Sequence, residues 1–309
     1  MDKVVITVTV DCSMSYPGFT GMPRIDDVPA VADEYIRAID AGASVVHHHG
    51  VHYLEDSIQD DGRRLSRTDF QGWADLTRRI RAKRDAVVQF GIASARLDEK
   101  VALMALRPEM MSYAFNVHDE FFQPDPDYPP NEQYAIHPRP ELEEFCAAAR
   151  EHGVKPEVES FYTGAFWNLE YIRGKGLLDD PVWTTLFLGW PGGAWTPPTP
   201  DSLLHLVAHL PPRVNWNVSV MNAAMQWRLL ALALSMGGHV RVGWEDNPYL
   251  PDGTPSRSNA ELVDTVVRLA RLMGREPASA AEARGIIGVP SYRNETAAGA
   301  PAAVEPIRS

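Results

Sequence analysis

The sequence predicts a (β/α)8 barrel, and two observations predict it. Short apolar runs rich in β-branched residues alternate with longer segments of helical period, and this alternation occurs eight times in 309 residues. A chain of this length also suits one large barrel domain. We therefore expect a single domain over residues 1–293 and a disordered, small and polar tail over residues 294–309.

Eight apolar runs are the expected strands of the barrel. Each is short, as buried parallel strands are, and each is bounded by polar or turn-forming residues. They cover residues 4–10, 44–49, 86–90, 110–115, 154–159, 184–188, 214–218 and 239–242.

A helical segment follows each expected strand. In residues 26–42 the apolar residues Val28, Ala32, Tyr35 and Ile39 share one helical face, and Gly42 ends the segment. Residues 139–153 show the same pattern and end at Gly153. The other expected helices cover residues 67–84, 97–106, 163–175, 199–209, 222–236 and 257–273.

Two longer segments interrupt the alternation, at residues 51–69 and 116–140. Both follow an expected strand, so we interpret them as extended loops between a strand and its helix. In a (β/α)8 barrel such loops build the active-site face.

Composition narrows the class of function. The net charge is −12, and no block of Lys and Arg is present, which argues against a nucleic-acid partner. Cys12 and Cys146 are the only cysteines, which excludes a disulfide framework and fits a reducing compartment. No window approaches ~18 uncharged apolar residues, so we expect no membrane partner and a cytoplasmic protein.

The stretch "SVVHHHGVH", residues 44–52, places four histidines at the end of the second expected strand. Side chains alternate along a strand, so His47 and His49 share one face and His48 points the other way. Two imidazoles at this spacing can bind a metal ion above the barrel. Hydrogen-bonded structural histidines are the alternative, because the spacing alone is a weak signal.

The last expected strand leads into the sequence "GGHVRVGWEDN", which adds charged residues at the same rim. Glu245 together with the two histidines would form a His2Glu set with open positions, suited to Zn²⁺ as a Lewis acid, although other divalent metals accept these ligands. Arg241 inside a barrel needs an anionic partner, either Asp246 or a substrate carboxylate. A purely structural Arg241–Asp246 ion pair is the alternative.

Further candidates for substrate binding lie after other strands. Asp11 ends the first strand, and Glu159 ends the fifth, with Glu157 on the same face. Gly192 and Gly193 follow the sixth strand and permit close backbone approach to a ligand, although a glycine pair is also an ordinary turn. Several aromatic residues near strand ends suggest an aromatic-walled pocket: Tyr162, Phe166, Trp167, Trp190, Trp195 and Trp244. The remaining histidines, His118 among them, are interpreted as structural.

Together these motifs resemble the β-keto acid cleavage enzymes, whose founding activity is 3-keto-5-aminohexanoate cleavage. The similarity is carried by "AGASVVHHHGVH", "VKPEVESF", "FLGWPGG" and above all "GGHVRVGWEDN", and it extends from Val4 to about Val289. It implies a zinc-dependent barrel enzyme, usually a homo-oligomer and often a homotetramer. It also implies condensation of a β-keto acid with acetyl-CoA and cleavage of the adduct to acetoacetate and a new acyl-CoA.

The resemblance assigns roles to named residues. The family's metal ligands fall on His47, His49 and Glu245, and its catalytic Arg and Asp fall on Arg241 and Asp246. In this assignment the metal and Arg241 hold the keto acid and its enolate, while Asp246 moves a proton.

Three positions depart from the family pattern. Met14 replaces an acidic residue, Val51 replaces an Arg, and Gly91 stands where the family carries a hydroxyl residue. Asp11 and Ser94 are the candidates to replace the lost acid and the lost hydroxyl.

These departures leave three hypotheses. The leading one is acetyl-CoA-dependent β-keto acid cleavage. The second keeps the metal, Arg241 and Asp246 but omits CoA, which gives a retro-aldol or retro-Claisen lyase or hydrolase. The third is a non-catalytic metal and ligand-binding protein.

Overall fold

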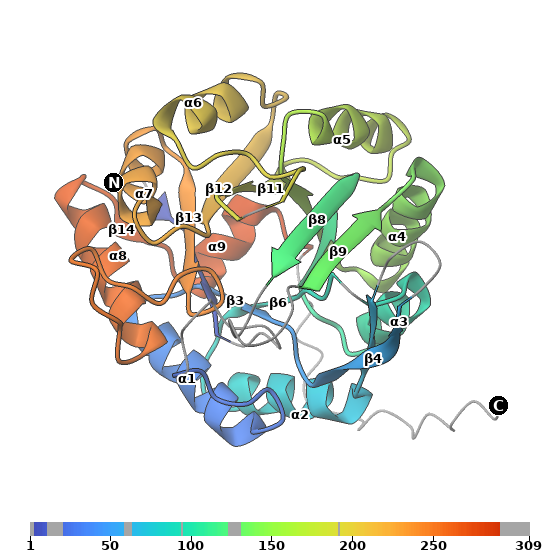
Figure 1. Cartoon of the computed structure of the whole chain (residues 1–309), viewed down its shortest axis with the longest axis horizontal. Helices are drawn as coiled ribbons and strands as arrows, with labels where there is room; N and C mark the ends of the chain where they lie inside the picture. Colours follow the sequence, from blue (N-terminus) through green and yellow to red (C-terminus); the bar gives the residue numbers. More distant parts are fainter. Residues whose placement is uncertain are drawn as a thin grey trace.

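The computed structural model shows a closed barrel of eight parallel strands inside a ring of helices (Figure 1). It describes residues 3–10, 21–58, 64–93, 95–122, 131–190 and 192–290. The barrel strands are β2 (Ile6–Thr9), β3 (Val45–His48), β6 (Val87–Phe90), β7 (Met110–Ala114), β10 (Lys155–Ser160), β11 (Val182–Leu188), β12 (Val214–Val220) and β13 (His239–Gly243). Strand β13 pairs with β2 and closes the barrel. The predicted fold class is confirmed.

Each barrel strand is followed by one of the predicted helices. These are α1 (Val28–Ala41), α2 (Phe70–Arg81), α3 (Leu97–Met104), α4 (Arg139–His152), α5 (Ala165–Gly174), α6 (Pro200–Ala208), α7 (Gln226–Ser235) and α8 (Asn259–Leu272). Gly42 and Gly153 end α1 and α4 at positive φ values of 123° and 69°, which glycine adopts without strain.

Three features were not predicted. Helix α9 (Ala280–Ile287) follows α8, and strand β1 (Lys3–Val4) pairs with β14 (Glu276–Pro277). The two segments interpreted as loops contain antiparallel hairpins, β4 (His52–Ile58) with β5 (Arg64–Thr68) and β8 (Val117–Phe122) with β9 (Asn131–Ile136). Their strands mix polar and aromatic residues, so no apolar run marks them. The predicted disordered tail, residues 294–309, lies outside the described residues.

The barrel interior changes character along the barrel axis. At its amino-terminal end, inward side chains pack with α9 in one apolar cluster: Val5, Val45, Val87, Met110, Trp183, Ala278, Ala283 and Ile287. One layer higher, the inward positions are polar and buried: Thr7, Gln89, Glu157 and Asn217. The alternate, outward side chains of the strands pack against the helices in the main core. This middle layer of the interior is therefore polar.

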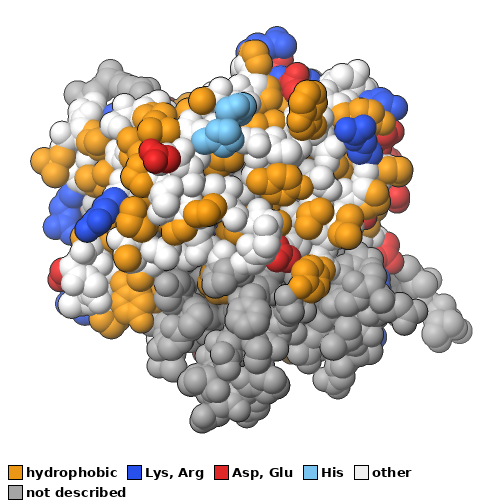
Figure 2. Space-filling model, turned by 45° about the horizontal axis from the view of Figure 1, so that its top comes forward, with side chains coloured by type: hydrophobic (Ala, Val, Ile, Leu, Met, Phe, Trp, Pro, Cys, Tyr) orange, Lys and Arg blue, Asp and Glu red, His pale blue; other side chains and the backbone are white. Residues whose placement is uncertain are grey.

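The surface is mixed. On the face in Figure 2, hydrophobic side chains are scattered among polar and charged groups. Trp167 on α5 and Leu272 on α8 are the most exposed large apolar side chains in the described residues, at 77% and 86%. None of the described helices combines the length and the apolar composition needed to cross a membrane.

Candidate active site

The two histidines of the HxH motif lie side by side at the carboxyl-terminal end of β3. The ring centroids of His47 and His49 are 5.0 Å apart. His48 points outward, where its ring packs 5.2 Å from Trp73 and 4.7 Å from Phe90. The alternation expected from the strand therefore places only His47 and His49 above the barrel.

Glu245 joins these histidines because β13 ends in a sharp turn. Gly243 has φ of +150°, and a Cβ at this position would collide with the carbonyl oxygen of Thr9, so only glycine fits. The turn is closed by hydrogen bonds from the backbone N–H groups of Asp246 and Asn247 to the carbonyl oxygen of Gly243. It returns Glu245 over the barrel mouth, with Oε1 at 3.0 Å from Nε2 of His49.

The three side chains fit a divalent metal ion. One ligand atom from each of His47, His49 and Glu245 lies within 4.8 Å of the other two. Burial lowers the pKa of His47 well below its ordinary value, which keeps the imidazole neutral and able to donate a lone pair. Nδ1 of His47 and Oε2 of Glu245 are buried without a hydrogen-bond partner among the described residues. Burial of Glu245 raises the carboxyl pKa, but nearby His49 and Arg241 outweigh it, so the net shift is downward.

Arg241 is held by two carboxylates. Its Nη2 donates to Oδ1 of Asp246 at 2.8 Å and to Oε1 of Glu245 at 3.0 Å, and its Nε donates to Oδ2 of Asp246 at 2.9 Å. Ser219 donates a further hydrogen bond to Asp246 at 2.8 Å. Burial raises the pKa of Asp246, although the guanidinium of Arg241 acts in the opposite direction. The predicted Arg241–Asp246 pair is therefore present, and Glu245 extends it to the metal-ligand set.

A narrow cavity of about 50 Å³ lies over these groups. Its polar walls include Arg241, Glu245 and Glu159, and Asp246 lies behind Arg241 rather than on the wall. Three aromatic side chains also line the cavity: Phe161, Phe187 and Trp195. The guanidinium of Arg241 lies over the ring of Phe187, 5.2 Å from its centroid. The cavity can therefore hold a small polar group against the metal ligands and an apolar group against the rings.

Sequence reasoning missed His118, which also lines this cavity. Its ring stacks 5.3 Å from that of Phe161. It belongs to β8, and nothing in the local sequence indicates that this hairpin folds over the barrel.

The two glutamates of β10 lie at different depths. Glu159 lines the cavity, as expected for a rim residue. Glu157 lies one layer deeper, where Gln89 and Thr185 donate hydrogen bonds to its carboxylate. Burial raises the pKa of Glu157 to about 7, and the charge of Glu159 adds to this shift.

The other predicted substrate contacts have different outcomes. Asp11 and Ser94 lie outside the described residues, as does Met14. Gly193 donates its backbone N–H to Asp119, and a Cβ on Gly192 would lie 2.6 Å from the carbonyl oxygen of Asp119. The glycine pair thus permits close approach of the loop to β8, within the protein itself.

Two departures from the family pattern have a structural explanation. A Cβ at Gly91 would collide with the ring of His47, so in this chain the ring uses the space that a side chain at position 91 would need. Val51 is buried and would contact any Cβ at Gly72 of α2. Position 51 therefore belongs to the apolar packing of α2 and not to the cavity.

The expected aromatic pocket is only partly correct. Trp195 lines the cavity, whereas Phe166 and Trp244 are buried in the main core and Trp167 is exposed on α5. Residues that follow strand ends point either inward to the mouth or outward to the helices, and the sequence does not distinguish the two.

Comparisons with known proteins identify the family of the chain. Residues 4–289 match the family model described as beta-keto acid cleavage enzyme. A 3-keto-5-aminohexanoate cleavage enzyme from Acetoanaerobium sticklandii is 32% identical over 296 residues, which are 94% of this chain and 99% of that protein. A 3-oxoadipate:acetyl-CoA acetyltransferase from Cupriavidus necator is 27% identical over 301 residues, which are 92% of this chain and 97% of that protein.

Solved structures of ObcA share the fold. The apo structure superposes with a TM-score of 0.64 at 18% identity and covers 85% of this chain and 65% of the ObcA chain. A ternary complex of ObcA with a C4-CoA adduct and oxalate gives a TM-score of 0.61. At this identity the likeness shows a common fold. The family model, in contrast, matches nearly the whole chain. On that basis this chain belongs to the beta-keto acid cleavage enzyme family.

Proposed function

We propose that this chain transfers the acyl part of a β-keto acid to CoA in a metal-dependent reaction with acetyl-CoA. The bond between the keto carbon and the CH2 of R–CO–CH2–COO⁻ breaks, and a bond forms between that CH2 and the acetyl carbonyl carbon. The CoA sulfur leaves the acetyl group and forms the new thioester with the R–CO carbon. The products are acetoacetate and R–CO–CoA. Two relatives named as acetyl-CoA-dependent transferases support this reaction class.

The observation that carries the proposal is the convergence of His47, His49 and Glu245 within 4.8 Å, next to Arg241. A divalent metal held there would supply a Lewis acid for the keto oxygen. Nε and Nη2 of Arg241 are occupied by Asp246 and Glu245, and Arg241 lines the cavity. Its Nη1 is then the group left to bind the carboxylate of the keto acid, through a charge-assisted hydrogen bond.

Asp246 would take the proton from the carbon between the keto and carboxylate groups. Burial raises its pKa, which makes it a stronger base than an exposed carboxylate. Asp246 lies behind Arg241. Its carboxylate can therefore take the proton only if the guanidinium moves aside or if the proton travels past the guanidinium to reach it. Ser219 and Arg241 orient its two oxygens for that transfer.

The second hypothesis, a CoA-independent lyase, has one specific observation behind it. The hydroxyl position of the family is occupied by Gly91, where the His47 ring fills the available space. Consumption of CoA distinguishes the two reactions. Zinc as the bound metal, a homotetramer and a cytoplasmic location stay predictions.

Metal content and acetoacetate formation test the proposal together. We expect one divalent metal ion per chain in the wild type and acetoacetate from acetyl-CoA with at least one β-keto acid. His49→Ala should lose metal affinity by more than the roughly 10–100-fold that outer partners of a ligand contribute. His48→Gln is the matched control, since the neighbouring side chain points away from the site. A metal-free wild type, or equal metal loss in both variants, would overturn the proposal.

A further inference from the structure

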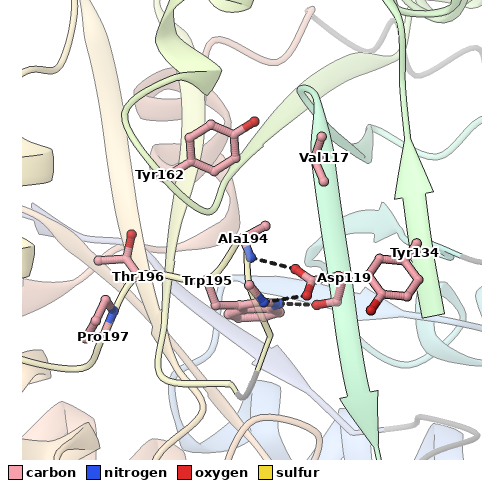
Figure 3. A pocket seen from close by; sticks show the side chains of 9 residues that line it. Val117, Asp119, Tyr134, Tyr162, Ala194, Trp195, Thr196 and Pro197 are labelled. Carbon is pink, nitrogen blue, oxygen red and sulfur yellow. Dashed lines mark hydrogen bonds between the residues drawn. The ribbon is translucent and has the colours of Figure 1, made fainter. Parts of the chain in front are cut away.

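An open cleft of about 500 Å³ adjoins the catalytic cavity (Figure 3). Three elements form its walls: the β8–β9 hairpin with Val117, Asp119 and Tyr134, the segment after β10 with Tyr162, and the loop after β11 with residues 193–197. Trp195 lines both this cleft and the cavity over the metal ligands. Trp195 therefore forms the boundary between the two, and a substrate side chain that passes this ring from the His47, His49 and Glu245 site would enter the cleft.

Asp119 and the loop after β11 make hydrogen bonds within the protein. The carboxylate of Asp119 accepts the backbone N–H of Gly193 and, at 2.6 Å, that of Ala194. The carbonyl oxygen of Asp119 accepts the indole N–H of Trp195 at 2.6 Å, as Figure 3 shows. Thr196 donates its hydroxyl to the carbonyl oxygen of Phe161 at 2.5 Å. These bonds hold the loop on the hairpin and leave the cleft few polar groups for a ligand.

The surface that remains is aromatic. Tyr134, Tyr162 and Trp195 present their rings to the cleft, and no Lys or Arg is among its lining residues in the described part of the chain. A ligand carboxylate or phosphate would lose its water without gaining a counter-charge there, and it would face the carboxylate of Asp119. An apolar ring would instead bury area against aromatic faces.

We propose that this cleft receives the side chain R of the β-keto acid and selects a bulky, uncharged and preferably aromatic group. This inference rests on the proposed function, because it assigns the reacting end of the substrate to the His47, His49 and Glu245 site. It separates this chain from the relative named for 3-oxoadipate, a keto acid whose R group ends in a carboxylate.

Three keto acids and two variants test the selectivity. The wild type should show a kcat/KM for 3-oxo-5-phenylpentanoate at least about tenfold above that for 3-oxoadipate. Ala194→Phe fills the cleft, and Tyr162→Ala removes one aromatic wall. Each should lower the ratio of kcat/KM for the phenyl compound to that for short 3-oxopentanoate by about tenfold or more. Ala147→Phe on the exposed face of α4 is the matched control and should leave this ratio at the wild-type value.

Calorimetric measurement of phenyl keto acid binding distinguishes failure of the proposed function from failure of the proposed cleft assignment. If no keto acid is turned over, the proposed function fails, and weaker binding to Ala194→Phe than to Ala147→Phe still supports the cleft assignment. A preference for 3-oxoadipate overturns the selectivity. A higher KM for acetyl-CoA in Ala194→Phe, seen with every keto acid, would also overturn the selectivity. The cleft would then hold the pantetheine arm of CoA.

Discussion

The two ends of the barrel interior differ in what their side chains do. At the amino-terminal end Val5, Val87 and Trp183 pack against α9 in an apolar cluster. At the other end His47, Arg241 and Glu157 occupy equivalent inward positions, all buried and all polar or charged. Barrels of this kind usually fill the interior with branched apolar residues. The difference indicates that the carboxyl-terminal end bears the cost of burying the charged groups of the site.

The polar end depends on mutual pairing. Arg241 is 2% exposed and forms ion pairs with the carboxylates of Asp246 and Glu245. Removal of one partner of a buried ion pair leaves an uncompensated charge. Substitutions at this end should therefore change both catalysis and stability, whereas substitutions at the apolar end should change stability alone.

The largest expected effect comes from Asp246→Asn. The amide keeps the shape of the carboxylate but removes its charge and its basicity, so we expect kcat to fall by roughly 10²–10⁴ while the metal ion is retained. Steady-state kinetics with acetyl-CoA and metal analysis of the same preparation measure both. If Asp246 only orients Arg241, the KM for the keto acid will rise and kcat will change by less than about tenfold.

At the opposite end, Trp183→Ala should destabilise the fold without affecting catalysis. Trp183 is 1% exposed and stacks 5.2 Å from the ring of His239, so its removal leaves a cavity under the barrel. We expect the free energy of unfolding to fall by about 3–5 kcal/mol, with kcat near the wild-type value below the unfolding transition. Urea unfolding measures the first, and Trp167→Ala on the surface is the control. A large loss of kcat in folded Trp183→Ala would show that the two ends are not independent.

The sequence predicted the eight strands of the barrel and, at its polar end, the residues at the centre of the site. Strand alternation alone separates His47 and His49 from His48, and the turn at Gly243 follows from a local glycine. The charged residues after the last expected strand then added Glu245 to these histidines across nearly two hundred positions, and the family resemblance assigned the same three ligands. The family prediction is confirmed by the match over residues 4–289.

The parts that could not be predicted depend on contacts between distant segments. Asp119 and Gly193 are 74 positions apart, and only the folded hairpin places Asp119, His118 and the aromatic cleft beside the mouth of the barrel. Helix α9 did carry a local signal, since Ser279 and Glu282 form a capping box. The pKa of Glu157 depends on burial and on Glu159, which alternation along a strand does not describe.

The smallest expected effect concerns pH and Glu157. Its pKa is raised from 4.5 to about 7 in the folded protein, chiefly by burial, with Glu159 raising it further and Thr185, Arg241 and Gln89 opposing the shift. The folded state therefore binds more protons than the unfolded state between these values. The contribution of Glu157 to stability is present below pH 4.5 and is lost as the pH rises to about 7.

Glu157→Gln should remove this dependence, because the amide keeps hydrogen bonding with Gln89 and Thr185 but does not ionise. Relative to the wild type at the same pH, the variant should gain up to about 3 kcal/mol between pH 4.5 and pH 8. Urea unfolding at both pH values measures the difference, with Glu151→Gln on the exposed surface of α4 as the control. An equal pH dependence in Glu157→Gln and the wild type would mean that Glu157 stays ionised in the fold. The polar layer would then hold a permanent negative charge beneath His47, His49 and Glu245. The two ends of the barrel would in that case differ in buried charge, and not only in the number of polar side chains.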